Sequence, residues 1–147
     1  MELKIETNFD FGKLSKSLAR LQNNYLENYA EGSAKQSKSN IDSGLSPPLE
    51  DSTRAIRFLR DEPLSPPLKA SGALYNSIRK DGTTLVMNFY GALHNKGFVI
   101  KNIPKEKPFS HMNGKKIPAR KFISTGLKNL KRINEKFMKD FRNAFRK

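Results

Sequence analysis

The sequence contains no cysteine, which excludes disulfide bonds and thiolate metal ligands. It has only two histidines, His94 and His111, and no His-Glu-x-x-His spacing, so it does not predict a zinc site. The glycines are scattered and form no phosphate-binding loop. Ser77 and His94 could form part of a catalytic triad, but no motif orients the histidine as a base. We therefore expect no cofactor, no metal and no enzymatic activity.

Long hydrophobic runs are also absent. The longest strictly apolar runs have three or four residues, far fewer than the roughly 20 that a membrane helix needs. Residues 1–7 lack the apolar stretch of a signal peptide. These features predict a soluble protein that is made without export and has no membrane partner. The apolar content of 36% is low, so part of the chain is expected to be exposed or to be buried only by partners.

Acidic residues are scarce in the last third of the chain. Residues 1–100 carry 13 Lys or Arg against 11 Asp or Glu, whereas residues 101–147 carry 15 against 3. Most of the net charge of +14 therefore belongs to the C-terminal segment. Such a block favours a polyanionic neighbour, which could be nucleic acid, an acidic protein surface or membrane phosphates, although a solubilising helix face has the same composition.

The N-terminal region predicts a helix. Residues 2–9 alternate polar and apolar side chains, which indicates a short strand or an extended arm. Asp10 could then cap a helix of about 20 residues. Its apolar positions recur at steps of three and four: Phe11, Leu14, Leu18, Leu21, Tyr25 and Tyr29. Residues 31–44 are small and polar, and they predict either a loop or a weak continuation of this helix.

A short sequence occurs twice after this helix. Leu-Ser-Pro-Pro-Leu stands at residues 45–49 and again at residues 64–68. Each proline pair requires an extended approach to the element that follows. After the first copy, Ser52 or Thr53 could cap a short helix.

The middle of the chain predicts β-structure. Asp81-Gly82 is typical of a type I′ hairpin turn, and residues 84–90 alternate with period two, as in a strand. Residues 91–97 form an irregular break after this strand, and residues 98–100 are a short β-prone run. His94 in that break is expected to be a hydrogen-bonded histidine at a strand end. Residues 101–117 predict a basic loop.

The C-terminal region predicts a long amphipathic helix over residues 118–147, because Pro118 suits the first turn of a helix. Its apolar stripe ends with three aromatic residues that we expect at a subunit interface: Phe137, Phe141 and Phe145. The predicted fold class is α+β within a single domain. It comprises an arm and N-terminal helix (1–30), a proline-containing segment with a short helix (31–71), a small antiparallel sheet of about three to five strands with a basic loop (72–117), and the final helix lying across the sheet.

Three motifs follow one another in order: Pro-Leu-Lys-Ala-Ser-Gly-Ala-Leu-Tyr-Asn-Ser-Ile (67–78), Tyr-Gly-Ala-Leu-His-Asn-Lys-Gly (90–97) and Ile-Pro-Ala-Arg-Lys-Phe-Ile (117–123). The ordered set resembles the virion-morphogenesis and tail-completion family of tailed bacteriophages, which includes neck and head–tail joining proteins. The sequence departs from the family at Ser71, where threonine is usual, and in the long lysine-rich loop before Pro118. The positions that match the family motifs are Gly72, Leu74, Ser77, Ile78, His94, Gly97, Pro118, Arg120 and Phe122.

The resemblance implies a structural virion protein, assembled in the host cytoplasm. It implies a ring around the DNA channel, with a hexamer as the expected form. The implied partners are further copies of the chain, the head-connector and tail proteins, and packaged DNA through non-specific contacts.

Physical considerations add expectations for single motif residues. Gly72 supplies a turn that a Cβ would not tolerate, Leu74 and Ile78 anchor the core, and Gly97 permits a bulge or a close backbone approach. Arg120 at a helix start would oppose the helix dipole. It is therefore either paired with a carboxylate or carbonyl, conceivably across a subunit interface, or an ordinary surface arginine.

Eight basic residues are the candidates for facing the DNA channel or a partner: Lys101, Lys105, Lys107, Lys115, Lys116, Lys128, Lys131 and Arg132. The alternative function is that of a basic nucleic-acid-binding protein, which would bind phosphates without sequence preference. No known nucleic-acid-binding module is recognisable in the sequence. An enzyme or toxin is the third hypothesis, and it would require a clustered polar pocket.

Overall fold

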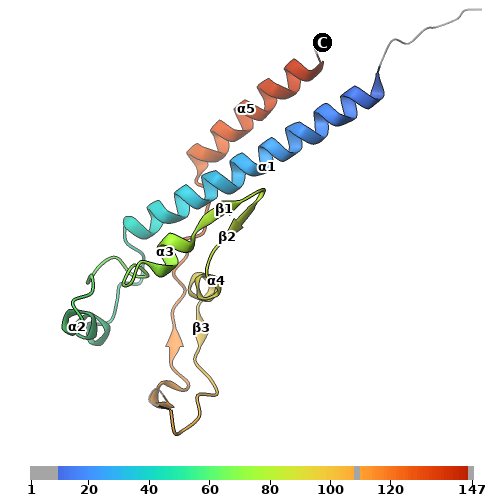
Figure 1. The fold of residues 1–147 in the computed structure, drawn as a ribbon. Helices are drawn as coiled ribbons and strands as arrows, with labels where there is room; N and C mark the ends of the chain where they lie inside the picture. Colours follow the sequence, from blue (N-terminus) through green and yellow to red (C-terminus); the bar gives the residue numbers. More distant parts are fainter. Residues whose placement is uncertain (1–9, 108–109, 146–147) are drawn as a thin grey trace, which may run out of the picture.

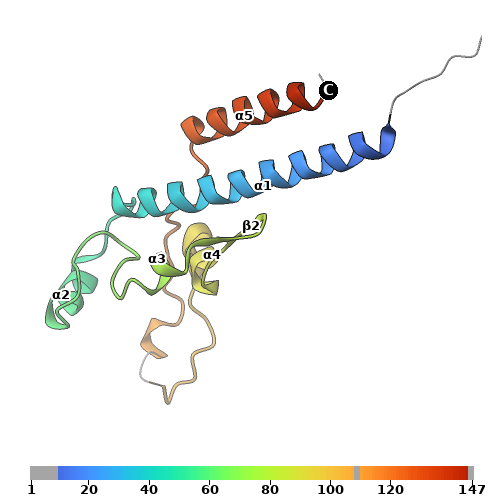
Figure 2. The same cartoon turned by 45° about the horizontal axis from the view of Figure 1, so that its top comes forward.

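A computed structural model describes residues 10–107 and 110–145. The predicted α+β class, with a long helix at each end and antiparallel strands between them, is confirmed. Helix α1 (Phe11–Asp42) runs the length of the molecule, and helix α5 (Leu127–Phe145) lies antiparallel beside it (Figure 1). The remaining elements lie on the other side of α1 (Figure 2). The arm predicted for residues 2–9 falls outside the described residues.

Helix α1 is longer than the sequence pattern indicated. Asp10 caps it as predicted, because its carboxylate accepts a hydrogen bond of 3.0 Å from the Lys13 backbone N–H. The small polar segment after residue 30 continues the helix to Asp42 and does not form a loop. Its small side chains are buried, and they let other segments approach closely: Ala30, Gly32, Ser33, Ala34 and Ser37. Tertiary packing therefore stabilises a stretch of weak intrinsic helix propensity.

Short elements follow α1. Helix α2 (Asp51–Leu59) follows the first Leu-Ser-Pro-Pro-Leu copy, and helix α3 (Ala73–Ser77) follows the second. The cap position of α2 is Glu50, so the predicted capping by Ser52 or Thr53 is wrong. Gly72 precedes α3 with a φ of +71°, which confirms that this turn suits glycine.

The predicted single sheet is wrong, since the strands form two separate antiparallel pairs. Strand β1 (Arg79–Asp81) pairs with β2 (Thr84–Val86) across a two-residue turn, in which Gly82 has a φ of +55°. The strand predicted to extend to residue 90 stops at Val86. Helix α4 (Phe89–Lys96) replaces both its end and the expected irregular break.

The second pair begins an arm that projects away from α1 (Figures 1 and 2). Strand β3 (Phe98–Val99) pairs with β4 (Lys116–Ile117), and the 3₁₀-helix η1 (Ser110–Met112) lies between them. We call residues 98–117 the basic arm. Gly97 enters this arm with a φ of +75°, and a Cβ there would lie 2.8 Å from the Ala119 backbone nitrogen. The predicted close backbone approach at Gly97 is therefore confirmed.

Helix α5 begins nine residues later than predicted, at Leu127, so Pro118 does not start a helix. Residues 118–126 are non-helical and run along the C-terminal half of α1, where Ser33 and Thr125 hydroxyls share a hydrogen bond of 2.7 Å. Helix α5 packs on α1 and not across a sheet, because Tyr25 and Phe137 make an edge-to-face contact with ring centroids 5.2 Å apart.

The core lies where the C-terminal half of α1 meets α3 and the segment before α5. Ile41, Leu74, Ile78 and Phe122 are each at most 2% exposed and pack together with Ala34. The prediction that Leu74 and Ile78 anchor the core is confirmed. Phe122 belongs to the same core, although the sequence pattern assigned it to a helix.

Candidate functional site

The three ordered motifs converge on one structural junction. The Arg120 backbone N–H donates to the His94 carbonyl at 2.8 Å, and the Asn95 side-chain oxygen accepts from the Phe122 and Ile123 backbone N–H groups at 2.9 and 3.1 Å. Ser77 accepts a hydrogen bond from the Asn88 backbone N–H at 2.9 Å. These bonds satisfy backbone groups of a segment that has no regular secondary structure. The motif residues therefore hold the fold together, and functional surfaces must be sought elsewhere.

Two buried arginines hold the two proline repeats. Arg120 is 6% exposed, and its guanidinium donates to the carbonyls of Pro47 and Pro48 at 3.0 and 3.2 Å. Arg57 is 8% exposed and donates to the Pro63 carbonyl at 2.9 Å. It also makes a longer contact of 3.4 Å to the carbonyl of Pro66 in the second repeat. Among the described residues, the proline segments do not pair with a strand, so their carbonyls can accept hydrogen bonds from the guanidinium groups.

The prediction of a carbonyl partner for Arg120 is thus confirmed within one chain, while its predicted position at a helix start is wrong. The alternative of an ordinary surface arginine is also wrong. Burial lowers the pKa of the Arg120 guanidinium; Glu50 opposes this change, and the nearby Arg57 adds to it.

A cleft of about 410 Å³ lies between the first proline repeat, α2, α4 and the basic arm. Arg57, Arg120 and Pro118 line it, and an ion pair of 2.9 Å between Lys115 and Glu50 joins the arm to the start of α2. The cleft thus has more cationic than anionic groups on its wall. Because Arg57 and Arg120 already donate to backbone carbonyls, the cleft is best described as a structural junction.

His94 lies on α4 and not at a strand end, and its Nδ1 atom is buried without a hydrogen-bond partner. The predicted hydrogen-bonded histidine is therefore wrong for this nitrogen. The ring makes edge contacts with Tyr90 and Phe98, at centroid distances of 6.5 and 5.5 Å. Burial lowers the pKa of His94 below its ordinary value of 6.5, and the nearby Arg120 charge lowers it further.

This environment makes stability depend on pH. Because the folded chain keeps His94 neutral, the unfolded chain binds the additional proton first as the pH falls. The contribution to stability is fully present above about pH 6.5 and is lost as the pH falls through the lowered pKa of the folded state. Urea unfolding between pH 7.5 and 5 should show this loss, and His94→Gln should reduce it. The His111→Gln variant, which keeps His94, should retain the loss.

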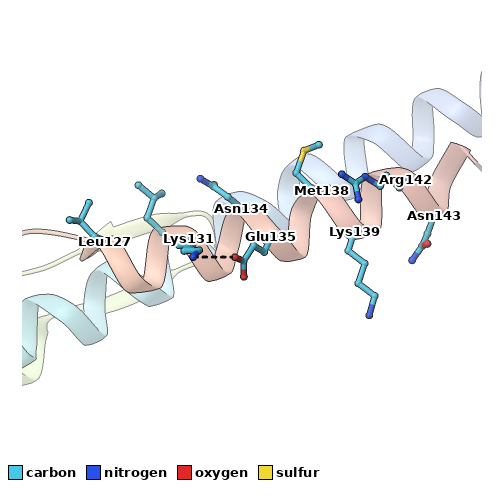
Figure 3. Close-up of a pocket in the computed structure, with 9 residues that line it drawn as sticks. Leu127, Lys131, Asn134, Glu135, Met138, Lys139, Arg142 and Asn143 are labelled. Carbon is cyan, nitrogen blue, oxygen red and sulfur yellow. Dashed lines mark ion pairs between the residues drawn. The ribbon is translucent and has the colours of Figure 1, made fainter.

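Helix α5 carries a shallow groove with exposed apolar side chains (Figure 3). Leu127 is 87% exposed and Met138 is 46% exposed, with Leu130 and Asn134 between them. Polar and charged residues border these positions, and we call the complete set the α5 groove: Leu127, Leu130, Lys131, Asn134, Glu135, Met138, Lys139, Arg142 and Asn143. Figure 3 shows the side chains of Leu127, Asn134 and Met138 following one edge of the helix.

The three aromatic residues predicted at a subunit interface are placed differently from one another. Phe137 is half-buried against Tyr25 of α1. Phe141 is half-buried between Phe137 and Phe145, at centroid distances of 6.1 and 4.6 Å. Phe145 is 50% exposed and extends the apolar edge of the α5 groove toward the end of the helix. Helix α1 therefore covers only the first part of this aromatic row.

The candidate basic residues fall into two groups. Lys101, Lys105, Lys107, Lys115 and Lys116 are exposed on the basic arm. Lys128, Lys131 and Arg132 are exposed on α5, on the opposite side of α1 (Figure 2). The structure does not bring the two groups together, so they cannot form one continuous basic patch on a single subunit.

Sequence reasoning missed the buried side chain of Arg57 and the bonds made by Asn95, because a polar side chain at a loop or helix position is normally exposed. It also missed the exposed end of α2. Within residues 10–107 and 110–145, no cluster of His, Asp or Glu could hold a metal ion. In the same residues, no helix combines the length and the apolar character needed to span a bilayer.

Comparisons with protein-family models, with curated proteins and with solved structures find no match for this chain.

Proposed function

We propose that this chain is a structural subunit of the head–tail junction of a tailed bacteriophage, where it forms a ring that joins tail to head around the DNA channel. The observation that carries the proposal is the exposed α5 groove, which lies on a helix that already packs another of its faces on α1. An apolar helix face of this kind is typical of a surface that another subunit covers. The ordered motifs of residues 67–123, which resemble those of neck and tail-completion proteins, specify the assembly.

The organisation of the fold supports an assembly role over catalysis. The buried Arg57 and Arg120 and the half-buried Asn95 bond to backbone groups of the chain itself. Large exposed apolar side chains lie on α1, α2, α4 and α5, and they include Phe58, Phe89 and Leu127. Burying them between subunits would add the core that the low apolar content of the sequence leaves incomplete.

The purified chain should therefore form ring-shaped particles in negative-stain electron microscopy, and native mass spectrometry should give one defined copy number. The measurement should cover a concentration series, because ring formation depends on protein concentration. A strict monomer at every concentration would contradict the proposal.

A second candidate function is DNA binding without sequence preference, which the exposed lysines of the basic arm favour. Each phosphate contact that is lost should reduce the slope of log K against log salt concentration by about 0.9. We expect the triple variant Lys101→Ala, Lys105→Ala and Lys107→Ala to lower this slope in fluorescence-anisotropy titrations with duplex DNA. The matched control replaces Lys13, Lys16 and Arg20 of α1 with alanine; an equal decrease there would show that the arm has no special role.

A further inference from the structure

Helix α2 exposes a second apolar surface. Phe58 is 74% exposed, Leu59 is 83% exposed and Ile56 is 50% exposed, whereas Arg57 of the same helix is buried. Leu64, which follows the helix, is 40% exposed. We call Ile56, Phe58, Leu59 and Leu64 the α2 patch. A short helix that buries its arginine and exposes its phenylalanine and leucine has the reverse of the usual arrangement, so the patch calls for a partner.

The α2 patch and the α5 groove cannot contact each other within one subunit. Figures 1 and 2 both place α2 beyond the C-terminal end of α1, on the side of α1 opposite to α5. The two surfaces therefore remain separately exposed on a single chain, and each is available to a different neighbour.

Their charges are complementary. Helix α5 carries six Lys or Arg against two Asp or Glu over residues 127–145, a net charge of +4. Residues 50–62 carry four Asp or Glu against three arginines, a net charge of −1, and one of these arginines is buried. In a chain of net charge +14, this is an acidic segment beside an apolar surface. Glu50 pairs with Lys115 and Asp51 with Arg54, so Asp61 and Glu62 are the carboxylates that would face a partner. Two α5 grooves would repel each other, whereas these two carboxylates would attract an α5 groove.

Resting on the proposed ring, we infer that the α2 patch of one copy docks into the α5 groove of the next copy. The contact joins two different surfaces, so each subunit keeps one free surface of each kind for a further neighbour. Contacts of this head-to-tail type produce closed rings when the rotation between subunits closes, whereas a contact between identical surfaces stops at a dimer. Phe58 and Leu59 would be the anchors, and Lys131 and Arg142 would border them.

Two single-surface variants test this contact. Phe58→Asp disables the α2 patch, and Leu127→Asp disables the α5 groove. Both side chains are at least 74% exposed, so both variants should fold, which circular dichroism and thermal unfolding can verify. Each variant alone should be monomeric at a concentration roughly tenfold above that of half-assembly of the wild type. A 1:1 mixture should form a dimer of one copy of each variant and nothing larger, because only one intact α2 patch and one intact α5 groove can meet.

The outcomes separate the contact from the proposed function. If the wild type forms rings and Phe58→Asp also does, the head-to-tail contact is wrong while ring formation stands. If the mixture of the two variants stays monomeric, the contact is wrong as well. A wild type that never assembles overturns both. A charge exchange gives an independent check: Asp61→Lys should weaken assembly, and adding Lys131→Glu should restore it.

Discussion

Replacing Phe122 with alanine should lower the free energy of unfolding by about 3–5 kcal/mol. Phe122 is fully buried and is the largest of the side chains excluded from solvent. It packs in one buried cluster with Ile41, Leu74 and Ile78, so its removal leaves a cavity among them. A domain of this size is stable by only about 5–15 kcal/mol, so the variant would lose a large fraction of its stability. Urea denaturation followed by circular dichroism measures the change.

Phe89→Ala is the matched control. Phe89 is 80% exposed at the start of α4, so its removal should change the free energy of unfolding by less than about 0.5 kcal/mol. Similar losses for the two variants would show that Phe122 is not in the core. The same result would also contradict the packing of residues 118–126 against the core.

The second large effect is expected at Arg120. Arg120→Met keeps most of the side-chain volume but removes the hydrogen bonds to the carbonyls of Pro47 and Pro48. Two carbonyls then lose charged donors, which should cost about 1.5–3 kcal/mol after allowing for the relief of a buried charge near Arg57. Chemical denaturation should show a lower midpoint with an unchanged slope, because the unfolded chain is not altered.

Two variants define this result further. Lys121→Met, at the exposed neighbouring position, should be nearly neutral. Arg120→Lys should recover only part of the loss, because an ammonium group cannot reproduce the planar fork that reaches two carbonyls. A stability of Arg120→Met equal to that of the wild type would mean that the arginine does not hold the first proline repeat.

The sequence predicted those parts of the fold that depend on local patterns. The cap at Asp10, the glycine turn at Gly72 and the helical pattern of α5 follow from side-chain types at fixed spacing. The turn around Gly82 was located correctly for the same reason. The burial of Leu74 and Ile78 was also predictable, because they are apolar residues that follow the turn at Gly72.

The parts that were wrong or left open depend on tertiary contacts. The sequence left the second half of α1 open between a loop and a weak helix, because it is rich in small polar residues, and the close packing of another segment on it stabilises the helix. The start of α5 was placed too early for the opposite reason. Residues 119–123 contain no glycine or proline and could form a helix, but backbone N–H groups of this segment bond to His94 and Asn95 instead. No periodicity in a single sequence contains that information.

The candidate surfaces were predicted only in part. An excess of aromatic residues at the end of α5 indicated unburied apolar area, and the structure leaves Phe145 half-exposed. The α2 patch gave no signal, since the pattern of α2 is that of an ordinary amphipathic helix. Only the structure shows that Arg57 faces inward and that Phe58 and Leu59 face outward.

The attachment of α5 has a consequence for how the molecule opens. Helix α5 rests on α1 through contacts such as Tyr25 with Phe137, while the sealed cluster around Phe122 lies at the other end of α1. Helix α5 can therefore detach as a unit and leave that cluster intact, at a free energy below that of global unfolding. The α5 groove lies on this helix, so a neighbouring copy that covers the groove would oppose the detachment and make the helix more rigid.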